Sequence, residues 1–143
     1  MASSFLRLQS VTVYVRDQDR SIHFYVNQLG FKLIVDTLLP DGSRWVAVGP
    51  ADAAAVLALV TPAPASEDYQ RIGRNTEVIF LAEDVHAKLA EWEKQGVRIR
   101  DISPLPGLSG KFATFEDLDG NTFRLVGHDV ATRRIEAERR AET

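Results

Sequence analysis

The chain has 143 residues, of which 45% are hydrophobic and 26% charged, and its formal net charge is −3. This is the composition of an ordinary globular domain, and no long segment concentrates the basic residues typical of a nucleic-acid-binding surface. Cysteine is absent, which excludes disulfides, thiolate metal ligands and a cysteine nucleophile. No segment resembles a signal peptide or a membrane-spanning helix. We therefore expect a cytoplasmic protein that binds neither membranes nor nucleic acids.

The first half of the chain predicts one helix and four strands. Residues 8–16 alternate between apolar and polar, as a strand with one packed face does. Asp17 is a suitable N-cap for the helix that follows, and Gly30 is a suitable stop. The remaining strands are predicted at residues 31–35 with a continuation to the turn at 40–42, at 43–49 and at 54–60.

The second half repeats this order after a linker at residues 61–75, which begins with prolines and small residues. A strand is predicted at 77–82, followed by an N-cap at Asp84 and a helix that Gly96 ends. The last elements are a strand at 97–100, a loop at 104–107, and a hairpin of strands 111–115 and 122–126. Asp119-Gly120 between alternating segments is among the strongest hairpin signals in a sequence.

The two halves align with each other at a spacing of 66 or 67 residues. Asp17 matches Asp84, Gly30 matches Gly96, and the segment 57–60 matches 123–126. Each half therefore predicts the order βαβββ, in an α+β fold of two tandem modules at about 8–60 and 76–127. One module leaves a bare sheet face, so the two modules are expected to form a single domain over residues 1–128.

Three segments resemble the vicinal oxygen chelate superfamily, which includes glyoxalase I, extradiol dioxygenases, and fosfomycin and bleomycin resistance proteins. The segments are Val13-Tyr14-Val15-Arg16-Asp17, Ser21-Ile22-His23-Phe24-Tyr25 with Leu29-Gly30-Phe31, and Asp117-Leu118-Asp119-Gly120-Asn121. The resemblance covers residues 8 to 126. It implies a curved mixed sheet that encloses a cavity, with helices outside, and it implies a homodimer. It indicates the fold much better than the reaction, because this scaffold hosts lyases, oxygenases and binding proteins.

Enzymes of the superfamily hold a metal ion with ligands, typically His and Glu, from the first and fourth strands of each half. The resemblance places Ser10, Ala58, Glu77 and Arg124 at these positions. A catalytic site needs about three protein ligands, and a guanidinium only donates hydrogen bonds. Glu77 alone could bind a metal well. We therefore predict no metal, no other cofactor and no catalytic residues, and an enzyme of the usual type is disfavoured.

The three histidines do not restore this metal site. His23 and His86 lie on the predicted helices, off their apolar faces, and His128 follows the last strand. No two of them have the spacing of paired ligands on a helix. Surface or capping roles are expected for them.

Alternation along the strands places a set of side chains on the cavity side, and these are Ser10, Thr12, Tyr14, Glu77, Ile79 and Arg124. We expect an ion pair between Glu77 and Arg124, with Ser10 nearby. This pair is compatible with a structural plug, because a buried ion pair mainly neutralises its own charges. It is equally compatible with Arg124 as the anchor of an anionic or carbonyl-bearing ligand.

Aromatic side chains would then supply the walls of such a binding site. Tyr14, Trp45 and Phe112 are the candidates, although Trp45 and Phe112 are also compatible with core or dimer contacts. The complete set of candidate ligand-binding residues is Ser10, Thr12, Tyr14, Trp45, Glu77, Phe112 and Arg124.

The last segment, residues 129–143, is densely charged and predicts a helix without a stop signal. It is compatible with a solvated terminal helix or with a linker to a further domain, as in glyoxalase-like sensor domains that precede serine phosphatases. The function expected from these features is metal-independent binding of a small organic, anionic or aromatic molecule, in a sensory or regulatory role. The alternatives are a metal-dependent lyase or dioxygenase with a rearranged site, and a drug-binding resistance protein.

Overall fold

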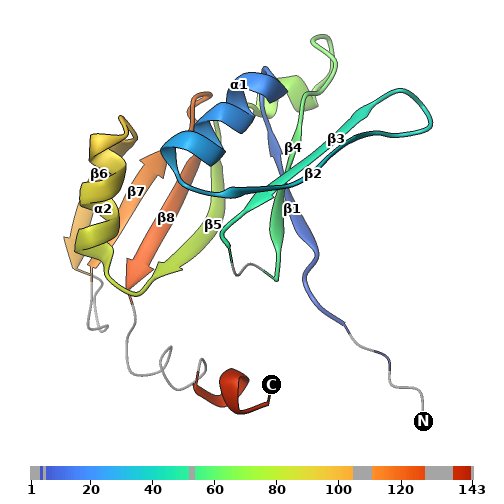
Figure 1. The fold of residues 1–143 in the computed structure, drawn as a ribbon. Helices are drawn as coiled ribbons and strands as arrows, with labels where there is room; N and C mark the ends of the chain where they lie inside the picture. Colours follow the sequence, from blue (N-terminus) through green and yellow to red (C-terminus); the bar gives the residue numbers. More distant parts are fainter. Residues whose placement is uncertain (1–3, 5, 52–53, 105–110, 128–136, 143) are drawn as a thin grey trace. The chain divides into compact units, whose positions relative to one another are not determined.

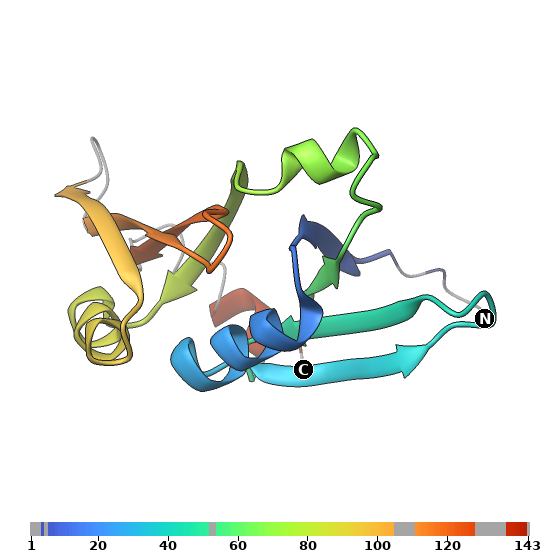
Figure 2. The same ribbon diagram turned by 90° about the horizontal axis from the view of Figure 1, so that it is seen from above.

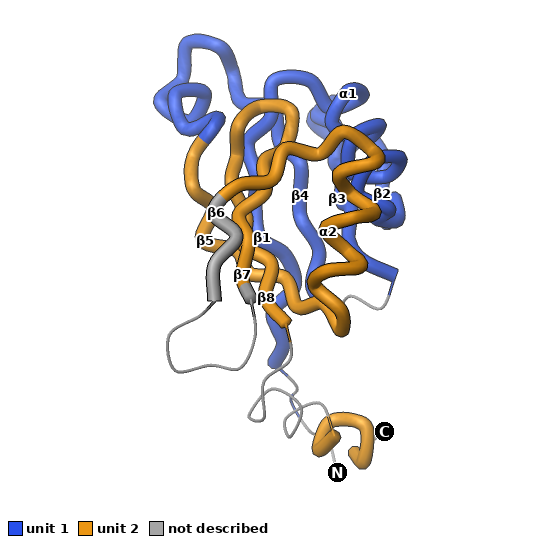
Figure 3. The backbone as a smooth tube through the Cα atoms, turned by 90° about the vertical axis from the view of Figure 1, so that its left-hand side faces the viewer, with its two compact units in different colours: residues 1–73 blue, residues 74–143 orange. Residues whose placement is uncertain are grey.

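The computed structural model describes residues 4, 6–51, 54–104, 111–127 and 137–142. It divides into two units, Met1–Gly73 and Arg74–Thr143 (Figure 3). The boundary lies within the predicted linker at residues 61–75, part of which forms a short 3-10 helix, η2 (Asp68–Arg71). None of the described helices is long and apolar enough to span a bilayer.

The first unit is a four-stranded sheet with a helix on one face (Figure 1). Its order is β1-β4-β3-β2, with β1 parallel to β4 and the other pairs antiparallel. The strands are β1 (Ser10–Tyr14), β2 (Lys32–Leu38), β3 (Arg44–Gly49) and β4 (Val56–Val60). The helix α1 (Gln18–His23) continues into a π-helical turn, η1 (Phe24–Gln28).

The second unit has the same topology, which confirms the predicted repeat. Its order is β5-β8-β7-β6, again with the first strand parallel to the last. The elements are β5 (Asn75–Ala82), α2 (Val85–Lys94), β6 (Arg98–Pro104), β7 (Lys111–Glu116) and β8 (Thr122–Gly127). In each unit the helix lies along one face of its own sheet (Figure 2).

The local signals that set the helix ends act as predicted. Asp17 and Asp84 accept hydrogen bonds from the backbone N–H three residues later, at 2.9 and 3.0 Å. Gly30 and Gly96 have φ of 80° and 84°, a conformation that favours glycine. The loop predicted at 104–107 differs at its start, because Pro104 still belongs to β6, and the rest of that loop lies outside the described residues. Of the predicted terminal helix, residues 137–141 are helical.

Each unit has an apolar core between its helix and its sheet. In the first unit Val13, Tyr25 and Leu59 are among the residues that are almost fully buried. In the second unit Trp92 of α2 lies 4.5 Å from Phe115, which stacks on Phe123 at 5.3 Å between ring centroids. The face of each sheet that carries these residues is therefore the face covered by the helix, and the opposite face carries residues outside this core.

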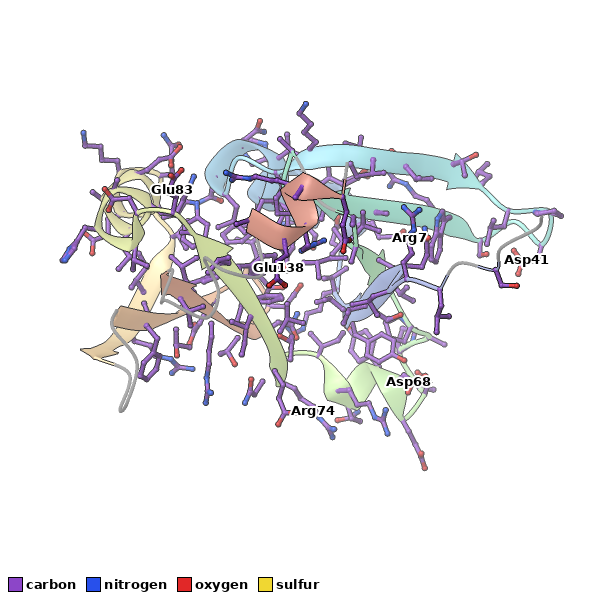
Figure 4. The ribbon with its side chains drawn as sticks, turned by 90° about the horizontal axis from the view of Figure 1, so that it is seen from below. Arg7, Asp41, Asp68, Arg74, Glu83 and Glu138 are labelled. Carbon is purple, nitrogen blue, oxygen red and sulfur yellow. The ribbon has the colours of Figure 1, made fainter. Side chains whose placement is uncertain are left out.

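The turn between β7 and β8 contains a buried polar network. Asp117 Oδ1 accepts the backbone N–H groups of Asp119 and Asn121, both at 2.9 Å, and Asp117 Oδ2 accepts the Asn121 amide at 2.9 Å. Asp117 and Asn121 are 4% and 2% exposed. Asn121 Oδ1 also accepts the backbone N–H of Arg74 at 3.3 Å. Arg74, labelled in Figure 4, is the first residue of the second unit. The predicted Asp119-Gly120 turn is confirmed, and Asp117 and Asn121 close it from both sides.

The first strand of the second unit is irregular around Glu77. Its pairing with β8 runs from Asn75↔Thr122 to Ile79↔Arg124, so β5 uses two more residues than β8 between these pairs. Glu77 has a φ of 60°, the one positive φ among the described non-glycine residues. Its N–H donates to Asn75 Oδ1 at 2.9 Å. A positive φ costs a non-glycine residue about 1–2 kcal/mol, so this strand stores strain at a residue with an exposed carboxylate.

Replacing Asp117 with Ala should lower the free energy of unfolding by about 2–4 kcal/mol, because it leaves buried N–H donors without an acceptor. Chemical denaturation of the full chain measures this. Leu118→Ala, at a half-exposed residue of the same turn, is the control and should change stability by less than about 0.5 kcal/mol. Equal losses in both variants would contradict a structural role of the buried network.

Replacing Glu77 with Gly should raise the free energy of unfolding by about 0.5–1 kcal/mol, because glycine adopts a positive φ without a Cβ clash. Glu77→Ala removes the same carboxylate but keeps the clash, so it should give no gain. The same denaturation experiment compares the two variants. A gain of equal size in both would show that the charge, and not the backbone, causes the strain.

Candidate functional site

The face of the first sheet opposite α1 carries four of the predicted residues. Along β1, Ser10, Thr12 and Tyr14 alternate with Val13, which is 2% exposed on the helix side. Thr12 pairs with Ala58 on β4, and Ala58 pairs with Ala47 on β3. Both alanines are almost fully buried. Small side chains therefore form the middle of this face.

Two aromatic residues lie on this face next to the small residues. Tyr14 pairs with Val60 on β4. Trp45 lies two residues before Ala47 on β3, so the antiparallel register places it opposite Val60. Val60 therefore separates Tyr14 on β1 from Trp45 on β3. Both rings are partly exposed. Because one strand separates them, their backbones are about 10 Å apart, which is suitable for contact with an organic molecule lying between them.

The strand that carries Trp45 is fixed to its neighbours through Arg44. The Arg44 guanidinium donates to both carboxylate oxygens of Asp36 on β2, at 2.8 and 2.9 Å, and to Asp19 of α1 at 2.8 Å. The hydrogen bonds from Arg44 lower the pKa of Asp36 and raise that of Arg44. Gln18 of α1 donates to the carbonyl oxygens of Arg44 and Leu59, at 3.2 and 2.9 Å. These contacts hold Trp45 at a defined place on the sheet.

The other three predicted residues belong to the second unit, and two of them meet. The guanidinium carbon of Arg124 on β8 lies 5.8 Å from the ring centroid of Phe112 on β7, within cation–π range. Arg124 is exposed, while its neighbours Phe123 and Leu125 are 1% and 2% exposed. The alternation predicted for β8 is therefore confirmed. Phe112 is a partner of Arg124 and lies on the exposed face.

The predicted ion pair between Glu77 and Arg124 is wrong. Ile79 is the residue of β5 that pairs with Arg124, and the irregularity of β5 separates Glu77 from that register. Within the described part of the chain, no ion pair joins Glu77 to Arg124. Regular alternation cannot place Glu77, because two extra residues interrupt the strand.

The residues at the superfamily's metal-ligand positions do not form a suitable donor set. Ser10, Ala58, Glu77 and Arg124 offer one carboxylate, and Arg124 brings a positive charge that would repel a cation. Among the described residues, no group of three or more His, Asp or Glu side chains could hold a metal ion. His23 and His86 are exposed, and the His23 ring bonds Asn27 at 2.7 Å. His128 lies outside the described residues.

Sequence reasoning missed several polar residues beside Arg124. Thr114 on β7 pairs directly with Arg124, and Arg100 on β6 pairs with Thr114. Glu116 on β7 binds Arg100 at 3.0 Å. The alternation of apolar and polar residues along 111–116 indicates which side chains share this face. It does not indicate their partners on β6 and β8, because these depend on the register between strands.

Comparisons with known proteins agree with this architecture. A model of the "Glyoxalase/Bleomycin resistance protein/Dioxygenase superfamily" matches residues 7–125. The chain is 30% identical to TnmS3, an antibiotic binding protein from Streptomyces sp. CB03234, with a TM-score of 0.72 over 88% of this chain and 98% of that protein. It is also 30% identical to a superfamily member from Sphaerobacter thermophilus, with a TM-score of 0.78 over 87% and 98% of the two chains.

A curated relative extends the comparison to an enzyme. The chain is 33% identical over 121 residues to a lactoylglutathione lyase of Oryza sativa subsp. japonica, and the match covers 79% of this chain. The match spans 41% of the length of the rice protein. The family model, the solved structures and the repeated βαβββ topology lead to one conclusion: the chain belongs to the glyoxalase/bleomycin resistance protein/dioxygenase superfamily.

Proposed function

We propose that this domain binds a small organic molecule without a metal ion. The observation that carries the proposal is the donor set, in which a serine, an alanine and an arginine share the superfamily's ligand positions with Glu77. Arg124 cannot bind a metal ion, since a guanidinium stays protonated and has no lone pair to offer. It is well suited to bind an anion or a carbonyl oxygen.

The exposed sheet faces supply the remaining parts of a binding surface. Ligand sites combine apolar and aromatic walls with a few polar groups that fix orientation. In the first unit Tyr14 and Trp45 lie on either side of Val60, next to a surface of small residues, with Ser10 and Thr12 as polar groups. In the second unit Phe112 lies beside Arg124. Each unit therefore offers aromatic area next to hydrogen-bonding groups.

The likeness to TnmS3 supports binding over catalysis, because that protein is described as an antibiotic binding protein. A drug-binding resistance protein and a sensory module would both bind a small molecule without a metal ion. The first would sequester a drug, and the second would use ligand binding for regulation. A metal-dependent lyase is the second candidate, favoured by the match to the rice lactoylglutathione lyase. The homodimer and the cytoplasmic location stay predictions made from the sequence.

The purified protein should contain no stoichiometric divalent metal, because the donor set offers one carboxylate where about three ligands are needed. Elemental analysis of the full chain measures this, together with thermal unfolding in the presence of Zn²⁺, Ni²⁺ or Mn²⁺. The melting temperature should not rise with any of the three ions. About one metal ion per chain would favour the lyase.

Binding of an aromatic compound should alter the fluorescence of Trp45. The chain has two tryptophans, and Trp92 is 3% exposed in the core, so Trp92→Phe leaves Trp45 as the reporter. A screen of neutral and anionic aromatic compounds should give saturable changes. Trp45→Ala should then weaken binding about tenfold, as measured by calorimetry, through loss of the ring contact.

Leu38→Ala is the matched control for this experiment. Leu38 is an exposed apolar residue of β2 that pairs with Arg44, so it lies on the opposite face from Trp45. Its removal should leave affinity unchanged. Equal losses in both variants would contradict a site on the Trp45 face.

A further inference from the structure

A row of paired residues crosses the exposed face of the second sheet. Arg100 on β6 pairs with Thr114 on β7, Thr114 pairs with Arg124 on β8, and Arg124 pairs with Ile79 on β5. Directly paired residues point to the same side of a sheet. Two arginine residues therefore flank Thr114 on one face of the sheet, and an apolar residue ends the row.

The neighbouring row shows which face this is. Ile99, Phe115 and Phe123 form the next paired set, and both phenylalanines are at most 1% exposed. Trp92 of α2 contacts Phe115 on that side. The row that contains Thr114 is thus on the side away from the helix, where Arg100, Arg124 and Ile79 are exposed.

Both arginines are held by neighbours on the same face. Glu116 accepts from Arg100 at 3.0 Å and lies 3.9 Å from Arg98. Arg124 rests against the Phe112 ring at 5.8 Å. Within the described residues Arg124 makes no ion pair with a carboxylate. Its charge is therefore oriented by an aromatic ring but not neutralised.

The charge of this face differs from that of the whole chain. Among the described residues that the register places on this face, Arg98, Arg100 and Arg124 carry three positive charges and Glu116 carries one negative charge, in a chain whose net charge is −3. Arg100 and Arg124 are two strand spacings apart, about 10 Å between backbones. Arg100 contacts Glu116 and Arg124 contacts Phe112, on opposite sides of Thr114 along β7. Both side chains are long enough to turn from these contacts toward one small anion above Thr114.

We propose that Arg124, Thr114 and Arg100 form a binding subsite for the carboxylate of a small organic acid. The proposal rests on the function proposed above and names the class of ligand. Guanidinium groups match the two oxygens of a carboxylate, and the Thr114 hydroxyl can donate a further hydrogen bond. Ile79 and Phe112 are placed beside the charged groups, where they contact the apolar part of an aromatic or aliphatic acid.

Benzoate and its neutral isostere benzamide test this proposal. Titration of the ¹⁵N-labelled full chain with each compound, followed by NMR, reports affinity and location together. Benzoate should shift the amide signals of Thr114 and Arg124 and should bind at least about tenfold more tightly than benzamide, because it alone makes charge-assisted hydrogen bonds. Raising the salt concentration should weaken the benzoate complex.

Substitutions test how much individual residues contribute to benzoate affinity. Arg124→Gln should weaken benzoate binding at least about tenfold and remove the preference over benzamide, and Thr114→Val should weaken it by a smaller factor. Arg98→Gln is the matched control, because Arg98 lies on the same face but outside the row. It removes the same charge and should leave the affinity within about twofold.

Three outcomes would overturn the carboxylate subsite: no benzoate binding, equal affinity for benzoate and benzamide, or equal losses in Arg98→Gln and Arg124→Gln. Equal binding of both compounds with signal changes near Trp45 would leave the proposed function intact and reject only the subsite. If neither these two compounds nor any compound of the fluorescence screen binds, the proposed function fails together with the subsite.

Discussion

The parallel pairing of the first strand of each half with its last strand is the constraint on which the rest of the structure depends. β1 pairs with β4 and β5 with β8, so the helix that follows each first strand must cross over and cover one face of the sheet. The apolar residues of all four strands then share that face with the helix. The other face is left for residues that the core does not need, and every candidate site residue whose direction the register settles lies there.

The two halves use the same place on their sheets for different chemistry. Arg124 on β8 corresponds in the repeat to Ala58 on β4, and Ile79 corresponds to Thr12. In one unit this place is a buried methyl group between small neighbours, and in the other it is an exposed cation against Phe112. In this chain the first unit carries an apolar surface at this place, and the second unit carries a basic one.

The sequence predicted most of the fold, because the signals that define it are local. Alternation, the caps at Asp17 and Asp84, and the repeat specified the order of elements in each half. The site was predicted less well, because it depends on register between strands. Alternation correctly put Arg124 on the exposed face, but the two extra residues of β5 moved Glu77 out of reach of it. Nothing in the pattern of residues 77–82 shows this irregularity. Thr114 and Arg100 were missed for the same reason, since only the pairing of β6, β7 and β8 brings them beside Arg124.

The buried turn at Asp117 and Asn121 also determines when the second unit can form. Arg74 bonds through its backbone to Asn121 and Thr122, and the strand that Arg74 precedes pairs with β8. A growing chain leaves the ribosome from its N-terminal end, so β5 waits for almost fifty further residues before its partner strand exists. The first unit has all its strands once residue 60 has emerged. During that interval β5 has no partner strand, and its apolar residues, Ile79 and Leu81 among them, are open to incorrect association.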